Sequence, residues 1–160
     1  GGGLPVGAYG GKRELMTMIA PSGPVYQAGT LSGNPLAVAA GSTTLSLLQN
    51  TDAYSILEER GAALEAGFRQ NVQDLGLDLY ITRYGSMLCL FFHPGPVTNY
   101  EDAKQCDTER FGRYFRAMLT RGIHLPPSQF EAIFLSAAHT TKDIDTTIQA
   151  NRESLQEAFN

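Results

Sequence analysis

The chain has 160 residues, of which 42% are hydrophobic and 18% are charged, and its formal net charge is -4 at pH 7. This balance is typical of a globular protein and excludes a disordered one. There is no basic stripe and no apolar run of transmembrane length, so we expect neither nucleic acid nor a membrane as a partner. The two cysteines, Cys89 and Cys106, lack metal-ligand spacing; we expect reduced thiols and no metal site.

The amino-terminal region is rich in glycine and does not start with methionine. Three glycines open the chain, and nine of its 17 glycines precede residue 35. We therefore expect the chain to be the carboxyl-terminal part of a longer protein, with any targeting signal upstream. Residues 4–9 predict a short buried strand, and residues 13–19 predict a short helix that ends before Pro21 and Gly23.

Residues 26–35, Tyr-Gln-Ala-Gly-Thr-Leu-Ser-Gly-Asn-Pro, predict a sharp turn that opens a helix. Pro35 suits the first helical position because its missing N–H would have no partner there, and Asn34 is a good N-cap. Thr30 and Ser32 add hydroxyl donors, so a phosphate would find hydroxyls, backbone N–H groups and the positive end of a helix dipole. An ordinary loop that caps a helix explains the same residues.

Two long helices are expected next. The first runs from the Asn34 cap to about residue 49, and the second covers residues 52–74 and ends at Gly76. Spacings of three, four and seven place the apolar residues of the second helix on one stripe. These stripe residues are Leu57, Leu64, Phe68, Val72 and Leu75.

The following segment alternates strands and helices. Residues 77–83 and 86–93 predict two strands joined at Gly85, and the second is so apolar that we expect it at the centre of a sheet. A helix is expected over residues 108–121, ended by a glycine. Its expected buried face consists of Phe111, Phe115, Met118 and Leu119.

The last segment predicts two short strands, residues 123–125 and 132–137, followed by a helix. Thr140 and Asp143 have the spacing of a capping box at the start of that helix. The order of elements favours a boundary near residue 50. We expect a glycine- and proline-rich part that cannot bury a core by itself, followed by a compact α+β unit of ordinary domain size.

Several polar residues are candidates for chemistry. His93, His124 and His139 are more typical of surface or loop positions than of a catalytic site. Glu131 follows a rigid diproline turn between two expected strands, and it is either a carboxylate that points into a cleft or a solvated residue at a strand start. Lys12 lies in a polar turn, whereas a reactive lysine needs a dry or cationic pocket, so we interpret it as solvated.

Six stretches of the sequence match one enzyme family. They are residues 1–11, 26–37, 95–97, 99–104, 127–132 and 138–140. Through them the chain resembles the glutamate-1-semialdehyde 2,1-aminomutase family, which belongs to the class III (fold type I) pyridoxal-phosphate aminotransferases. The piece Gly-Asn-Pro-Leu-Ala is shared broadly within class III, whereas Pro-Ser-Gln-Phe-Glu and Asn-Tyr-Glu-Asp-Ala are much more specific to the aminomutases.

The resemblance implies the α/β fold of the fold type I transferases that depend on pyridoxal phosphate (PLP). Residues 1–50 would be the end of the large PLP-binding domain with an interface helix, and residues 51–160 the small α+β carboxyl-terminal domain. Two such chains would form a homodimer with shared active sites. Each active site would hold PLP or pyridoxamine phosphate (PMP).

The same resemblance implies roles for four residues. Thr30, with the Gly29 backbone, would bind the cofactor phosphate of the neighbouring subunit, and Tyr26 would reach across to the same active site. Glu131 matches the family glutamate that faces the substrate pocket. The Schiff-base lysine of the family would lie just upstream of Gly1, so the chain would need that missing amino-terminal part for activity.

The reaction implied by the resemblance moves an amino group within glutamate 1-semialdehyde and yields 5-aminolevulinate, the precursor of porphyrins and chlorophyll. The expected compartment is the cytoplasm, or the plastid stroma in a plant or alga. Two alternatives remain open: another class III ω-aminotransferase, and a non-catalytic dimerisation fragment.

Overall fold

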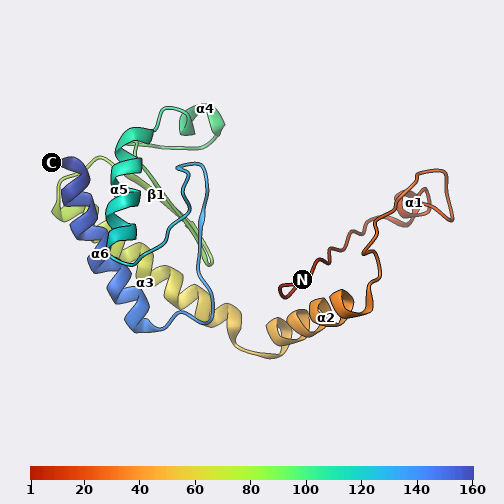
Figure 1. Ribbon diagram of the computed structural model, residues 1–160. Coiled ribbons are helices and arrows are strands. Elements are labelled where there is room, and N and C mark those ends of the chain that lie inside the picture. Colours follow the sequence, from red (N-terminus) through yellow and green to blue (C-terminus); the bar gives the residue numbers. More distant parts are fainter. The chain divides into compact units, whose positions relative to one another are not determined.

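The computed structural model describes residues Gly1–Asn160, which form two compact units, Gly1–Asp52 and Ala53–Asn160 (Figure 1). The first contains helices α1 (Arg13–Met16) and α2 (Pro35–Asn50). None of the helices combines the length and apolar character needed to cross a bilayer.

The start of the first unit differs from the sequence prediction. Residues 4–9 form no strand and are exposed, so the predicted buried strand is wrong. The physical reason is the lack of a pairing partner, because an isolated strand is not stable in water. A single parallel bridge, between Ile19 and Val25, is the unit's only strand-like pairing. Helix α1 ends at Met16, earlier than expected.

Helix α2 begins as its sequence predicts. The Ala37 backbone N–H donates to Asn34 Oδ1 over 3.1 Å, and Pro35 occupies the first turn. The apolar residues of the helix are nevertheless uncovered, since Leu36 is 74% and Leu45 is 67% exposed. Ala37 is the one buried hydrophobic residue of the first unit. This unit therefore has good helix-capping chemistry but no core of its own.

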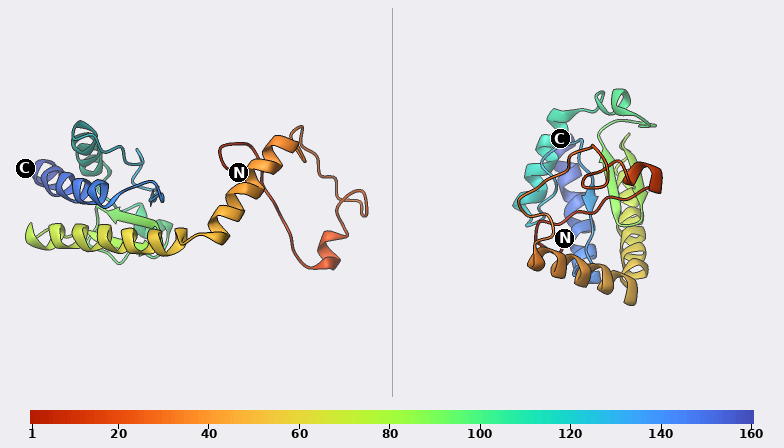
Figure 2. Two further views of the ribbon diagram at one scale, coloured as in Figure 1. Left: turned by 90° about the horizontal axis from the view of Figure 1, so that it is seen from below. Right: turned by 90° about the vertical axis from the view of Figure 1, so that its right-hand side faces the viewer.

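The second unit is a three-stranded antiparallel sheet with helices against it. Its helices are α3 (Ala53–Asp74), α4 (Tyr100–Ala103), α5 (Thr108–Thr120) and α6 (Thr141–Phe159), and its strands are β1 (Tyr80–Tyr84), β2 (Met87–Phe91) and β3 (Ile133–Phe134). The strand order is β1-β2-β3, which confirms the central position expected for the second strand. Helix α6 contacts both α3 and α5 and lies between them (Figure 2).

Residues of β2 alternate between two environments. Leu88 and Leu90 are buried, whereas Met87 on the opposite face is 38% exposed. This period of two means that one face of the sheet supplies the core. The largest fully buried side chains of the core are Tyr114, Phe68, Leu64, Leu88, Met118 and Leu155.

Two sequence predictions in this unit are wrong. Leu119 is 48% exposed, and Tyr114 takes a place on the buried face of α5 instead, because positions 111, 114 and 118 share one side of a helix. Residues 123–125 form no strand. Leu125 is buried, but one edge of β2 pairs with β1 and the other with β3 and then with the side-chain amide of Gln129, so no edge of β2 remains for it.

Predicted helix ends of the second unit are confirmed. Thr140 and Asp143 form a complete capping box at α6, in which the Asp143 N–H donates to Thr140 Oγ1 and the Thr140 N–H donates to the Asp143 carboxylate. Gly76, Gly85 and Gly122 adopt positive φ values of 61°, 57° and 80° where helices or strands end.

A buried polar chain connects three helices. Asn71 of α3 donates to Asn151 Oδ1 over 2.9 Å, and Asn151 of α6 donates to the Tyr114 hydroxyl of α5 over 2.8 Å. Asn151 is fully buried, and burial raises the pKa of Tyr114 well above its usual value. Every member thus has a partner away from water, which makes each one costly to remove.

Replacing Asn151 with alanine should lower the free energy of unfolding by about 1–3 kcal/mol, because it leaves buried partners without hydrogen bonds. Chemical denaturation followed by circular dichroism measures the change. The matched control is Gln149→Ala, an exposed amide on the same helix, which should change stability by about 0.5 kcal/mol or less. Equal losses in the two variants would contradict a stabilising role for the chain.

Arg83 of β1 joins the sheet to α3. Its guanidinium donates to Glu65 Oε2 over 2.7 Å, to Glu58 Oε1 over 2.8 Å and to the Gly85 carbonyl over 2.8 Å. Hydrogen bonding to Arg83 lowers the pKa of the Glu65 carboxyl below its usual value of 4.5. The ion pair therefore stabilises the folded state wherever Glu65 is ionised.

An Arg83→Met variant should lose stability at pH 7, and the loss should shrink in acid. Because the folded-state pKa of Glu65 is lowered, its stabilisation is present above about 4.5 and disappears as the pH falls through the lowered value. Urea denaturation between pH 7 and pH 3 measures this dependence. Lys104→Met, which removes an exposed pair with Glu101, serves as the control and should leave the pH dependence unchanged.

Candidate functional site

The turn before α2 is built by two local backbone hydrogen bonds. The Ser32 N–H donates to the Gly29 carbonyl and the Asn34 N–H donates to the Leu31 carbonyl, each over 3.0 Å. Gly33 has a φ of 72°, which disfavours any residue with a Cβ. At Gly29 a Cβ would lie 2.9 Å from Ser32 Oγ, so glycine keeps this turn tight.

Most donors of the first turn of α2 are not free to bind an anion. Pro35 has no N–H, and Asn34 already accepts from Ala37. In the turn before the helix, by contrast, the backbone N–H groups of Thr30, Leu31 and Gly33 donate no hydrogen bond. The helix-dipole part of the phosphate prediction is thus weaker than expected, and the turn itself carries the open donors.

The hydroxyls of Thr30 and Ser32 add to those donors. Both residues are exposed, and neither hydroxyl is engaged in a hydrogen bond. Open N–H groups and hydroxyls on one turn are the donor set that a phosphate needs. The residues present therefore fit the phosphate of a cofactor.

Tyr26 lies four residues before Thr30 in an extended segment. Its side chain is 83% exposed and makes no hydrogen bond or ring contact within the chain. An aromatic ring that is so exposed is available to another surface or ligand.

Glu131 lies in the second unit, at the rim of an open pocket of about 460 Å³. The pocket is lined by His124, Leu125, Pro126, Pro127, Glu131, Ala132, Ile133 and Phe134. Glu131 is exposed and its N–H donates to the Ser128 carbonyl over 3.2 Å. Both interpretations of this residue describe it in part, since it is solvated and also lines a pocket.

Gln129 is the residue of this region that sequence reasoning missed. It is only 4% exposed, and its side-chain amide donates to the Leu90 carbonyl over 2.9 Å and accepts from the Phe92 N–H over 3.0 Å. A lone glutamine between Ser128 and Phe130 carries no local signal of burial. Its burial follows only from the position of β2 and the residue after it, whose backbone groups its amide binds.

The other polar candidates have local partners. His139 Nδ1 accepts from the Ser136 N–H over 3.0 Å, and His93 Nδ1 accepts from the Gly95 N–H over 2.9 Å. His124 packs its ring on Phe115, with centroids 6.3 Å apart. No group of three or more His, Cys, Asp and Glu side chains is arranged to hold a metal ion.

Lys12 and the cysteines also show no reactive arrangement. Lys12 is exposed and makes no ion pair. The cysteines are free thiols, and burial raises the pKa of Cys89. A protonated thiol is a weak nucleophile, so Cys89 fits a structural position.

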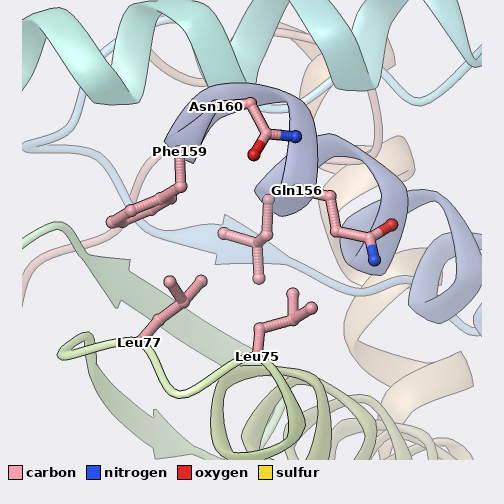
Figure 3. A pocket seen from close by; sticks show the side chains of 6 residues that line it. Leu75, Leu77, Gln156, Phe159 and Asn160 are labelled. Carbon is pink, nitrogen blue, oxygen red and sulfur yellow. The ribbon is translucent and has the colours of Figure 1, made fainter.

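A second pocket, of about 510 Å³, lies near the end of α6 (Figure 3). Leu75 and Leu77 face Phe159 across it, and the amides of Gln156 and Asn160 complete its rim. It has no ionisable side chain, so it offers no acid–base group and is not a candidate active site.

Comparison with known proteins assigns the family. The model of the family "Aminotransferase class-III" matches residues 1–158. The chain belongs to the class III aminotransferases. This membership confirms the family part of the resemblance that the sequence motifs indicate.

Curated relatives are similar over nearly the whole chain. The glutamate-1-semialdehyde 2,1-aminomutase of Chlorobium phaeovibrioides is 59% identical over 158 residues, which cover 99% of this chain and 37% of the relative. The enzyme of the same name from Clostridium novyi is 55% identical and covers 98% of this chain and 36% of the relative. The class III chain thus spans little more than a third of the length of these relatives.

Solved structures confirm the predicted fold. An ω-transaminase from Sphaerobacter thermophilus superposes with a TM-score of 0.88 at 30% identity and covers 100% of this chain and 37% of its own. A glutamate-1-semialdehyde aminomutase from Pseudomonas aeruginosa gives a TM-score of 0.74 at 27% identity, with coverage of 82% and 29%. The mixed helix and sheet arrangement is therefore that of the class III aminotransferase fold.

Proposed function

We propose that this class III chain supplies part of a PLP-dependent aminomutase that converts glutamate 1-semialdehyde to 5-aminolevulinate for porphyrin and chlorophyll synthesis. The observation that carries this proposal is its 59% identity, over 99% of the chain, to an enzyme of that name. The activity belongs to a longer protein, because the chain spans 37% of that relative. Cytoplasm, or plastid stroma in a plant or alga, is the proposed location.

The ω-aminotransferase alternative is not favoured. The Sphaerobacter ω-transaminase has a very similar backbone but only 30% identity. A common backbone does not determine the substrate, since one fold supports many reactions. The non-catalytic alternative is likewise less well supported, because the turn at residues 29–33 keeps its open donors.

In the proposed enzyme, Thr30 and the Gly29 backbone hold the phosphate of PLP or PMP. Thr30 contributes a hydroxyl and a backbone N–H, and Gly29 allows the turn to close tightly. When bound, the cofactor supplies the electron sink for moving an amino group. The chain's own contribution is to fix the phosphate, and thereby the orientation of the ring, with donors that need no reorganisation.

We further propose a homodimer with shared active sites, in which Thr30 and Tyr26 serve the neighbouring subunit. The support is the surface of the first unit, where Tyr26, Leu36 and Leu45 are each more than 60% exposed. Exposed apolar side chains in this number are typical of surfaces that a partner covers. Tyr26 would then position the substrate in the neighbour's site.

Glu131 is proposed to act on substrate placement. Its exposed carboxylate at the rim of the 460 Å³ pocket would repel a substrate carboxylate that enters in the wrong orientation. Like charges that come close together disfavour each other, so one glutamate at this pocket can select an orientation.

A chimaera tests the proposed function. The 158 residues of this chain that match the Chlorobium phaeovibrioides relative would replace the corresponding segment of that relative, which supplies the rest of the enzyme. We expect the purified chimaera to bind PLP and to form 5-aminolevulinate from glutamate 1-semialdehyde, measured by colorimetric assay. The unmodified relative is the positive control. Transamination without 5-aminolevulinate would instead support the ω-aminotransferase alternative, and failure to bind PLP would support the non-catalytic one.

The phosphate assignment has its own test in the same chimaera. Thr30→Val should weaken PMP binding about 10- to 100-fold, because a hydrogen bond to a charged group is worth about 1.5–3 kcal/mol. Isothermal titration calorimetry measures the dissociation constant. Thr43→Val, an exposed threonine on α2, is the matched control and should bind normally. Unchanged affinity in the Thr30 variant would remove this residue from the phosphate site.

A further inference from the structure

The hydrogen-bonding edge of β2 that faces β3 continues beyond the end of β3. Backbone pairing of the two strands includes Leu88 with Ile133, and the Leu135 N–H donates to the Ser86 carbonyl. The next groups along the same edge belong to Leu90 and Phe92. They are bonded not by a strand but by the side-chain amide of Gln129.

Gln129 therefore acts as a substitute for a strand residue. Its amide presents one acceptor and one donor, which match the Phe92 N–H at 3.0 Å and the Leu90 carbonyl at 2.9 Å. The side chain is 96% buried, so water cannot replace either bond without movement of the loop. The loop that contains Gln129 is held against β2 by these two bonds.

Glu131 lies between two attachments to the same strand. Gln129 is bonded to β2 two residues before it, and Ile133 pairs with β2 two residues after it. The Phe130 N–H donates to Ser128 Oγ over 3.2 Å, and the Phe130 ring lies 6.1 Å from that of Tyr100. The backbone of Glu131 is thus fixed from both sides while its carboxylate remains exposed at the pocket.

We infer that Gln129 is a positioning residue for the reaction: its buried amide holds Glu131 at the pocket rim. The inference rests on the role proposed above for Glu131. Loss of the amide leaves a buried N–H and a buried carbonyl without partners, and these are satisfied only if the loop opens to water. Opening the loop displaces Glu131 although the glutamate itself is unchanged.

A double-mutant cycle in the chimaera tests this inference. The single variants are Gln129→Met, which keeps side-chain length but loses both hydrogen bonds, and Glu131→Gln. Each should lower kcat for glutamate 1-semialdehyde by about 10- to 100-fold and KM by a similar factor, because the substrate then also binds in the wrong orientation without reacting. The kcat of the double variant should lie within about twofold of the kcat of the less active single variant, because both changes remove the same function.

Asn151→Ala is the matched control for a purely structural effect. Asn151 is as buried as Gln129 and also uses its amide in hydrogen bonds, but it lies in the core between α3 and α5. Its effect on kcat should multiply with that of Glu131→Gln. If the Gln129 and Glu131 effects also multiply, Gln129 has only a structural role and the inference is wrong.

A second variant and a second readout keep the test independent of folding yield. Gln129→Glu retains the acceptor for the Phe92 N–H but sets a buried carboxylate oxygen against the Leu90 carbonyl, so we expect a loss of activity at least as large as that of Gln129→Met. Hydrogen–deuterium exchange should rise at residues 128–131 in Gln129→Met and stay unchanged there in Asn151→Ala. Equal exchange at these residues in the wild type and Gln129→Met would overturn the inference.

These outcomes separate the inference from the proposed function. A chimaera that forms no 5-aminolevulinate contradicts the proposed function, while exchange at residues 128–131 still decides whether Gln129 holds the loop. A fully active Glu131→Gln variant removes the role of Glu131, and the positioning inference with it, but leaves the aminomutase proposal standing.

Discussion

Strand β2 is the element on which the second unit depends, because both of its edges are occupied and one of its faces is buried. On one edge it pairs with β1 over five residue pairs. On the other it bonds β3 and then the Gln129 amide, and the Phe92 carbonyl beyond β2 accepts from the Asp107 N–H that opens α5. Buried hydrogen-bonding groups are costly to leave without partners. The strand therefore determines where β1, residues 129–134 and the start of α5 must lie. The pocket with Glu131 at its rim is a consequence of that arrangement.

The two units of this class III aminotransferase chain have opposite physical characters. The second unit buries leucines, phenylalanines and the polar chain through Asn151, so contacts within the unit stabilise its fold. The first has a well-capped helix but buries only Ala37 among its hydrophobic residues, and Tyr26 is almost fully exposed. Burial of apolar area is the main stabilising contribution in folded proteins, so the first unit depends on surfaces outside itself. A shared active site between subunits is the arrangement that we propose for it.

Local chemistry and overall similarity support different parts of the functional proposal. Sequence identity of 59% to an aminomutase supports the reaction, whereas a similar backbone is also found in an ω-transaminase at 30% identity. The turn at residues 29–33 supports an anion site because its N–H groups and hydroxyls are open. Most of the free donors lie in the turn before α2. In the first turn of the helix itself, the Ala37 N–H is bonded to Asn34 and Pro35 has no N–H.

The sequence by itself determined the features that depend on neighbouring residues. The Asn34 cap, the Thr140–Asp143 capping box, the helix-ending glycines and the apolar central strand all follow from interactions within a few positions of the chain. The family motifs predicted the fold, because stretches of this kind occur together in related proteins. Tertiary structure alone decided which apolar runs become strands and which polar residues are buried. Residues 4–9 lack a pairing partner, residues 123–125 meet a strand whose edges are taken, and Gln129 is buried because β2 offers an N–H and a carbonyl at the spacing of its amide. Strand pairing and polar burial depend on partners far away in sequence, which local patterns do not specify.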